Sequence, residues 1–351
     1  MTNSFISTRL TKEYKVKFPF AAAGMAFIGS TPDLAIAVCE SGGIGSIGVG
    51  PLPAEAIRSI VREVKKGTRH PFNVNFITLF ATEDHIRVCI EEKVSIVSFH
   101  FGHPPKKFID LLHQAKIKVW EQVGSVETAK KAVDNGIDLV IAQGWEAGGH
   151  NFSTMPIFVL VPQIVEAIKP VMVLAAGGIA TGKQVAAALC LGADGVWVGT
   201  RLVASNEAFA HSAYKKRLLQ EDGTDTTLTP IFGPELPNFN PIRVIKNSVV
   251  KEFTGKENTV PTDTSNEPVI GKTVFFGKEF TLRRFTSFPP VPTTEGNFEE
   301  MPLLAGQGVG LIHEIKPVRE IITVMMGDAA ITLSSFHDKQ WSIPETQYTN
   351  N

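Results

Sequence analysis

Short apolar segments alternate with amphipathic helical segments over the first 200 residues, and this alternation limits the possible folds more than any other feature. The apolar segments lie at residues 18–24, 44–50, 72–78, 94–102, 118–124, 139–144, 171–178 and 195–200. They are typical of buried strands, whereas the segments between them, such as 54–66 and 182–192, place apolar residues at helical spacing. We therefore predict eight strands with seven helices between them.

Eight consecutive βα units favour a closed TIM (β/α)8 barrel, because open doubly wound sheets more often stop at about five or six strands. The alternative is an open sheet in which one segment has been counted as a strand in error. Segment 44–50 (IGSIGVG) is the weakest of the eight, since its glycines suit a loop equally well.

The residue composition of the chain changes after Ser205, and the regular alternation of segments ends. Residues 206–220 are expected to form a last helix, and 221–300 contain many Thr, Pro, Asn and Gly residues, which interrupt regular structure. Helical periodicity returns from about residue 301. We predict an α/β fold in which 1–205 and 301–351 form the barrel, the latter as a returning C-terminal helix, and 206–300 form a smaller α/β cap that binds substrate.

Composition excludes several classes of protein. The 34 basic and 35 acidic residues give a net charge of −1, which argues against nucleic-acid binding. No apolar run reaches the roughly 18 to 20 residues of a membrane helix. The basic start before FPFAAAGMAFIG resembles a signal peptide, but Asp33 and Glu40 follow it, so a buried strand is preferred. Three widely spaced cysteines indicate neither a disulfide framework nor a zinc site, and the expected location is the cytoplasm.

The three cysteines also give little support for a thiol nucleophile. Cys39, Cys89 and Cys190 fall in apolar helical segments, where a thiol is usually a small core residue. A GxSxG elbow is missing as well. A bound cofactor is therefore expected to supply most of the chemistry.

The active site of a (β/α)8 barrel lies at the C-terminal ends of the strands, and glycines after strands seven and eight commonly bind a phosphate there. Gly177 and Gly178 follow the seventh predicted strand, and Gly199 and Thr200 close the eighth. These glycines could simply form tight turns, but their presence at both expected places favours phosphate binding. The stretch GGIATGK also matches the start of a P-loop, yet Gln184 stands where a magnesium-binding Ser or Thr is needed.

His150 is the main candidate for proton transfer. It follows strand six in QGWEAGGH, where two glycines allow the backbone to approach a planar ligand and deliver an imidazole with a pKa of about 6.5. His100 is the rival, and it shares one face of strand four with Ser98. Ser98 and His100 are expected to contact substrate. A metal site from His100, His103 and His150 is disfavoured because no carboxylate stands at ligand spacing, so no metal is predicted.

The segments AGM (23–25), VNF (74–76), AQGWEAGGH (142–150), LAAGGIATG (174–182) and GADGVWVGTR (192–201) together resemble the FMN-dependent nitronate monooxygenase family, formerly called 2-nitropropane dioxygenases. The resemblance covers about residues 18–205, and AGQGVGLI (305–312) is similar to the family's returning segment. QGxEAGGH is its most specific part. One departure is AAAGMAFIG, since many members have a proline just before the methionine.

The resemblance implies a TIM barrel that binds FMN without a covalent bond. Residues expected to hold the flavin are Gly24, Met25, Asn75, Gln143, Gly148, Gly178, Trp197, Val198, Gly199 and Thr200. His150 would be the active-site histidine, either hydrogen-bonding the nitro oxygens of a nitronate or acting as base toward a neutral nitroalkane. The substrate would pass an electron to FMN and react with O2, giving a carbonyl compound and nitrite.

Two other functions stay open at this point. A flavin-dependent, NADH-linked enoyl-acyl-carrier-protein reductase shares the barrel and a similar EAGGH segment. A protein that binds flavin or another phosphorylated ligand without turnover is the second alternative. The sequence predicts neither the oligomeric state nor the physiological substrate.

Overall fold

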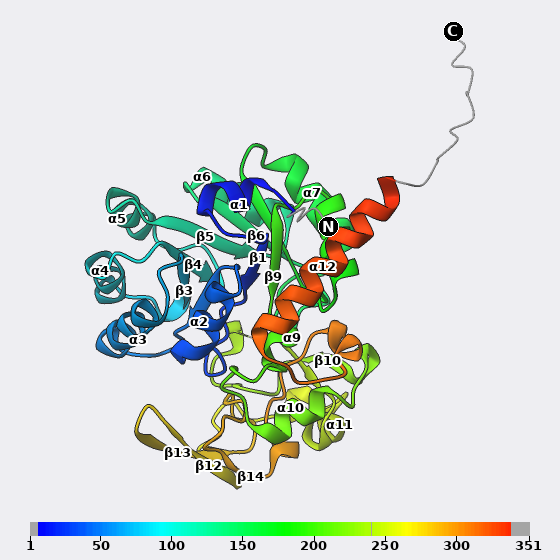
Figure 1. Cartoon of the computed structure of the whole chain (residues 1–351). Coiled ribbons are helices and arrows are strands. Elements are labelled where there is room, and N and C mark those ends of the chain that lie inside the picture. The colour runs from blue at the N-terminus through cyan, green and yellow to red at the C-terminus, as the bar shows by residue number, and fades with distance from the viewer. Residues whose placement is uncertain (1–5, 240, 338–351) are drawn as a thin grey trace.

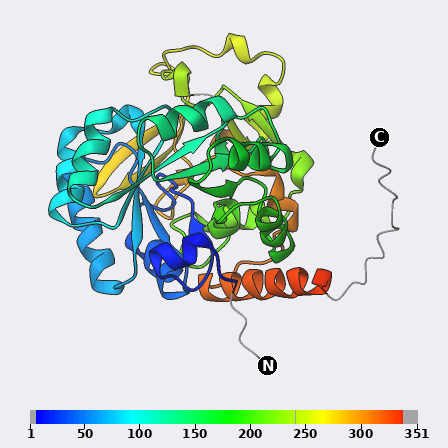
Figure 2. The ribbon, with the colours of Figure 1, turned by 90° about the horizontal axis from the view of Figure 1, so that it is seen from above.

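The computed structural model describes residues 6–239 and 241–337, and its centre is a closed barrel of eight parallel strands (Figures 1 and 2). The strands are β1 (Phe20–Ala22), β2 (Gly45–Gly48), β3 (Phe72–Ile77), β4 (Ile96–His100), β5 (Lys118–Val123), β6 (Leu139–Gln143), β8 (Met172–Ala176) and β9 (Gly195–Val198). Their order is β1-β9-β8-β6-β5-β4-β3-β2, and a parallel bridge from Ala21 to Ile44 joins the two ends. The predicted TIM barrel is confirmed, and segment 44–50 does contain a strand.

Seven helices surround the barrel between consecutive strands, as predicted (Figure 2). They are α2 (Pro32–Glu40), α3 (Ala54–Gly67), α4 (Glu83–Glu91), α5 (Lys106–Gln114), α6 (Val126–Asp134), α7 (Ile157–Ala167) and α8 (Gly182–Cys190). Cys39 and Cys89 are buried on these helices, but Cys190 is exposed, so its expected place in the core is wrong. Helix α8 ends at this residue.

The strands separate two apolar layers, because successive side chains point to opposite faces. The outer layer fills the space between strands and helices, whereas the inner layer fills the barrel. A short helix, α1 (Arg9–Tyr14), closes the N-terminal end of the inner layer. There Trp120 Nε1 donates a hydrogen bond to the Tyr14 hydroxyl at 2.7 Å, so the open end of the barrel is the C-terminal one.

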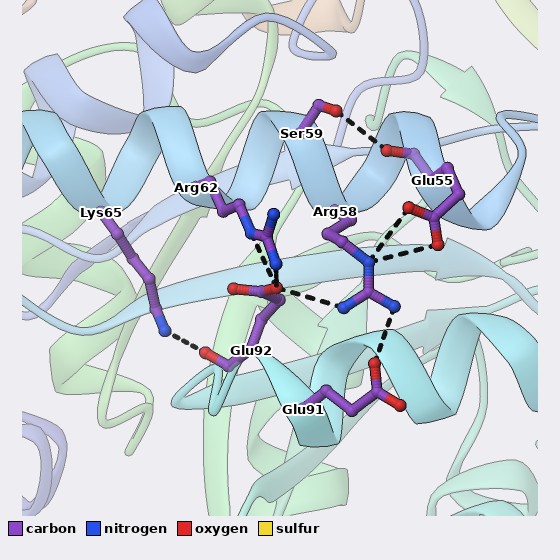
Figure 3. A network of polar contacts seen from close by, with 7 residues as sticks. All are labelled: Glu55, Arg58, Ser59, Arg62, Lys65, Glu91 and Glu92. Atoms are coloured by element: carbon purple, nitrogen blue, oxygen red, sulfur yellow. Dashed lines mark hydrogen bonds and ion pairs between the residues drawn. The ribbon is translucent and has the colours of Figure 1, made fainter.

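Helices α3 and α4 are joined on the outside of the barrel by an ion-pair network (Figure 3). Arg58 bridges Glu91 at 2.7 Å and Glu92 at 3.2 Å, and Arg62 lies 2.8 Å from Glu92. Partial burial of Glu92 tends to raise its pKa, but the hydrogen bonds from Arg62 and Arg58 outweigh that effect and lower it. This network connects α3 with the C-terminal end of α4.

A cap covers the C-terminal end of the barrel (Figure 1). Its regular elements are α9 (Thr200–Val203), α10 (Ser212–Leu218), α11 (Ser248–Phe253), β10 (Thr226–Thr229), β11 (Ile242–Ile245), β12 (Val269–Phe275), β13 (Lys278–Arg283) and β14 (Glu295–Gly296). Strands β12–β14 form one sheet, and β10 and β11 form another with β7 (Gly149–His150), which comes from the barrel loop after β6. The predicted last helix is shorter than expected, since 206–211 are not helical.

The returning segment is helical only in its second part. Residues 301–317 contain one 3₁₀ helix, η6 (Gln307–Leu311), before α12 (Val318–His337) packs against α8 and α2. The other 3₁₀ helices are η1 (Thr78–Phe80), η2 (Gly223–Asp225), η3 (Pro237–Phe239), η4 (Glu257–Thr259) and η5 (Phe298–Glu300). Residues 338–351 of the predicted barrel range lie outside the described residues. Among the helices described, none is both long and apolar enough to cross a membrane.

Candidate active site

A cavity of roughly 390 Å³ lies at the C-terminal ends of the strands, between the barrel and the cap. Most of the side chains and glycines predicted for the site line it, namely Gly24, Met25, Asn75, His100, Gln143, Gly148, His150, Gly178, Trp197, Gly199 and Thr200. The fold therefore brings together residues that are up to 176 positions apart in the chain, from Gly24 to Thr200. Two predicted contacts, Ser98 and Val198, do not line the cavity.

The turn after β8 has the geometry of an anion-binding cradle. Gly178 has a φ of +68°, a left-handed conformation that favours glycine. Gln184 braces this turn, since its Nε2 donates to the Gly178 carbonyl at 2.6 Å and its Oε1 accepts from the N–H of Ala180 at 2.8 Å. Gln184, which stands where a P-loop has Ser or Thr, thus supports the turn after β8.

The cradle contains backbone donors that the protein itself does not use. Across 6–239 and 241–337, no carbonyl or side chain accepts a hydrogen bond from the N–H of Gly178, Ile179 or Gly199. All three residues line the cavity. N–H groups that line a cavity and have no acceptor in the protein are free to bind an anion, so this arrangement fits a bound phosphate at the position predicted from the glycines.

Asn75 and Gly24 form a second wall of the cavity. A Cβ atom on Gly24 would lie 2.2 Å from the Asn75 side chain, so this close approach requires glycine. Asn75 Nδ2 donates to Ser98 Oγ at 2.8 Å, and the amide oxygen of Asn75 is the end that remains for a ligand. Ser98 also accepts from Asn73 Nδ2 at 2.8 Å and is fully buried beneath the cavity. The prediction that Ser98 contacts substrate is corrected, since this hydroxyl orients Asn75 instead.

The prediction that Val198 helps to hold the flavin is corrected for a different reason. Its side chain belongs to the outer apolar layer, between the strands and the helices, and its carbonyl accepts a hydrogen bond from the Ala23 N–H at 2.9 Å. Its neighbour Trp197 points inward and lines the cavity. Strand alternation therefore assigns only one of these two adjacent side chains to the site.

The loop after β6 is held by two residues that the sequence analysis missed. Asn151 is buried, and its Nδ2 donates to the carbonyls of Gly144 and Trp145 at 3.0 Å each. Arg243 from β11 donates to the same Trp145 carbonyl at 2.9 Å through Nη2 and lies over the Trp145 ring. Asn151 directly follows GGH and was detectable as a buried-loop polar residue, whereas nothing in the sequence pairs Arg243 with residue 145.

His150 lies where this loop meets the cap. It is on β7, opposite Ile242 of β11, and Gln143 Nε2 donates to its carbonyl at 3.0 Å. Nδ1 lies 2.6 Å from the Phe239 carbonyl, which only accepts, so Nδ1 carries the proton. Burial lowers the pKa of His150 to about 4, although the Phe239 contact acts in the opposite direction. The neutral ring therefore presents Nε2 as a hydrogen-bond acceptor.

His100 lines the same cavity, but its two ring nitrogens have hydrogen-bonding roles opposite to those of His150. Gln122 Nε2 lies 3.3 Å from His100 Nδ1, so Nδ1 accepts and Nε2 carries the proton. This Nε2 is buried and, among the described residues, has no partner. Burial, with a smaller effect of His150, lowers the pKa of His100 to about 3. The ring of Phe101 packs against both histidines, with centroid separations of 3.9 Å and 4.8 Å.

His103 does not join the other two histidines. Its Nδ1 lies 2.6 Å from Glu121, a buried carboxyl whose pKa burial raises to about 8. Glu121 is not at ligand spacing from His103 in the sequence, and only the fold brings the two side chains together. Within the described ranges, no group of three or more His, Cys, Asp or Glu side chains is arranged to hold a metal ion.

Fold and cavity together define a (β/α)8-barrel protein with a site suited to a phosphorylated ligand at the C-terminal ends of its strands, and comparison with known proteins identifies its class. The sequence model of the family "Nitronate monooxygenase" matches residues 7–84 and 78–328. The chain therefore belongs to the nitronate monooxygenase family, and the resemblance found in the sequence is confirmed.

Curated relatives carry the same family name. The chain is 32% identical over 305 residues to a probable nitronate monooxygenase of Staphylococcus saprophyticus, covering 73% of this chain and 83% of the relative. It is 33% identical over 258 residues to a nitronate monooxygenase of Paraburkholderia phytofirmans, covering 60% and 70%.

Two solved structures have the same fold along most of the chain. FabK from Thermotoga maritima has a TM-score of 0.79 and 34% identity, covering 95% of this chain and 99% of that one. A nitroalkane oxidase from Streptomyces ansochromogenes has a TM-score of 0.76 and 26% identity, covering 93% and 99%.

Proposed function

We propose that the protein binds FMN without a covalent bond and oxidises alkyl nitronates, and through their nitronates also neutral nitroalkanes, with O2. Two nitronates and one O2 would give two carbonyl compounds and two nitrite ions. The observation that carries the proposal is the position of His150, whose Nε2 acceptor shares one cavity with the unused donors of the phosphate cradle. We place the reaction in the cytoplasm, because the three cysteines are unpaired.

The residues present fit FMN. The N–H groups of Gly178, Ile179 and Gly199 would hold its phosphate, and the Asn75 amide oxygen offers an acceptor to a ring N–H. Met25, Gly148 and Trp197 are available to contact the rest of the flavin. When bound, FMN would supply the one-electron chemistry that amino-acid side chains lack.

The two histidines would then have complementary tasks. His150 Nε2 accepts, so it suits removal of the α-proton from a neutral nitroalkane. His100 Nε2 donates, so it suits a nitro oxygen, where negative charge accumulates in the nitronate. This division assigns the two roles considered for His150 to two different side chains.

Nitrite release tests the proposal. The holoenzyme in air, without NADH, is expected to release nitrite from an alkyl nitronate. His150→Asn, with flavin still bound, is expected to lose most activity toward the neutral nitroalkane. A colourless protein that added FMN does not reconstitute, or an unchanged rate in the variant, contradicts the proposal.

The second candidate is the flavin-dependent, NADH-linked enoyl-acyl-carrier-protein reductase, to which the segment EAGGH (146–150) is similar. This function predicts NADH consumption with a crotonyl thioester and no nitrite from a nitronate. Measuring both reactions on one preparation separates the candidates, because each requires a different electron donor.

A further inference from the structure

The cap side of the cavity differs in chemistry from the phosphate cradle. Its walls are formed by Phe27, Phe80, Phe232, Leu236, Phe239 and Phe288. Several of these rings pack on one another, with centroid distances of 4.4 Å between Phe27 and Phe288 and 5.8 Å between Phe80 and Phe239. The space next to His150 is therefore lined on this side largely by apolar side chains, which favours burial of hydrocarbon.

The same region contains no cation for an anionic substituent. Among the described residues that line the cavity, none is Lys or Arg, and Glu235 is the one acidic residue. Glu235 accepts a hydrogen bond from the Thr264 hydroxyl. The Tyr214 hydroxyl is also engaged, since it donates to the Leu304 carbonyl. A carboxylate on the substrate would lose water, find no cation and face Glu235.

We propose that this site selects nitronates whose carbon carries an uncharged, apolar chain and discriminates against nitronates that carry a carboxylate. The inference rests on the proposed function and adds the substrate class to it. The apolar walls hold the chain, and Glu235 repels a second negative charge at the cap.

The first experiment compares kcat/KM for nitrite release from nitronates. For the 1-nitronates of ethane, propane, butane and pentane, kcat/KM is expected to rise about three- to fourfold per methylene until the walls are filled. Propionate 3-nitronate is compared with 3-methylbutane 1-nitronate, in which an isopropyl group replaces the carboxylate. The uncharged compound is expected to be at least about tenfold better, the factor that about 1.4 kcal/mol of differential binding produces.

The second experiment reverses the charge at the cap. In Glu235→Lys, the preference for the uncharged compound over propionate 3-nitronate is expected to shrink about tenfold or more. Glu279→Lys is the matched control, because it makes the same charge change on exposed β13 outside the cavity. It is expected to leave the preference unchanged.

Binding without turnover separates failure of this inference from failure of the proposed function. The flavin absorbance of the holoenzyme is titrated without O2 with 1-nitrobutane, 1-nitropentane and 3-nitropropionate. Tighter binding of the longer, uncharged compounds without any nitrite release supports the selectivity and contradicts the proposed reaction. Nitrite release with equal or better use of propionate 3-nitronate, unchanged in Glu235→Lys, supports the reaction and overturns the selectivity.

Discussion

Ser98 Oγ and Asn75 Nδ2 are 2.8 Å apart, and this hydrogen bond determines which end of the Asn75 amide faces the cavity. Ser98 itself is buried beneath the site, so it acts on a ligand only through Asn75.

Replacing this serine is therefore expected to weaken flavin binding. Ser98→Ala removes the acceptor for Asn75 Nδ2 and leaves a buried donor unpaired, which costs about 1–3 kcal/mol. The Kd for FMN, measured by fluorescence during reconstitution, is expected to rise about tenfold, with a smaller effect on kcat at saturating FMN. Ser59→Ala on exposed α3 is the control (Figure 3). Equal FMN affinity in both variants would show that Ser98 does not orient Asn75.

The donor role of His100 gives a second prediction. His100→Leu removes the unpaired Nε2–H and is expected to lower kcat/KM for a nitronate about 10- to 100-fold while FMN remains bound. His113→Asn, on the outside of the barrel beside Asp138, is expected to have no effect. Steady-state nitrite assays and the flavin spectrum of each variant provide the readout. Loss of the flavin spectrum together with activity would instead indicate a structural role.

The lowered pKa values of the two cavity histidines predict a flat pH profile. A histidine whose pKa is lowered is neutral above that value, and the pKa is about 4 for His150 and about 3 for His100. In the free enzyme neither ring titrates between about pH 5.5 and pH 8, so kcat/KM for a preformed nitronate is expected to stay constant there. An inflection near about 6.5, the ordinary value for histidine, would contradict the buried neutral state.

Glu121 predicts a loss of stability as pH rises. Its pKa is about 8 in the folded protein and ordinary in the unfolded chain, so between these values the folded state holds one more proton. The free energy of unfolding then falls with increasing pH, by at most about 1.4 kcal/mol per pH unit. Glu121→Gln removes this titration and is expected to unfold at higher temperature than the original protein at about pH 8 but not at about pH 5. Parallel pH dependences in calorimetry would contradict a protonated Glu121.

The barrel and its cradle were predictable because both depend on local signals. Alternating segments indicate the strands, and glycines at the ends of β8 and β9 indicate the turns whose N–H groups face the cavity. Depth was harder. Ser98 and His100 share a face of β4, but two residues along a strand span about 6.6 Å, enough to place Ser98 below the cavity floor.

The cap was less predictable, because its sheets depend on long-range pairing. Strand β7 has two residues in a glycine-rich loop, and it forms a strand only because β11, more than ninety positions later, pairs with it. Periodicity within either segment cannot show this pairing. For the same reason the contact between Arg243 and the Trp145 carbonyl was missed.

The pairing of β7 with β11 also makes cap exchange between relatives a demanding engineering task. The imidazole of His150 is held by a strand register whose other half, Ile242 and Arg243, belongs to the cap. A chimaera that carries the cap of a relative, made to alter substrate choice, must keep this register. If the register changes, His150 is displaced together with the apolar walls that the new cap was meant to replace.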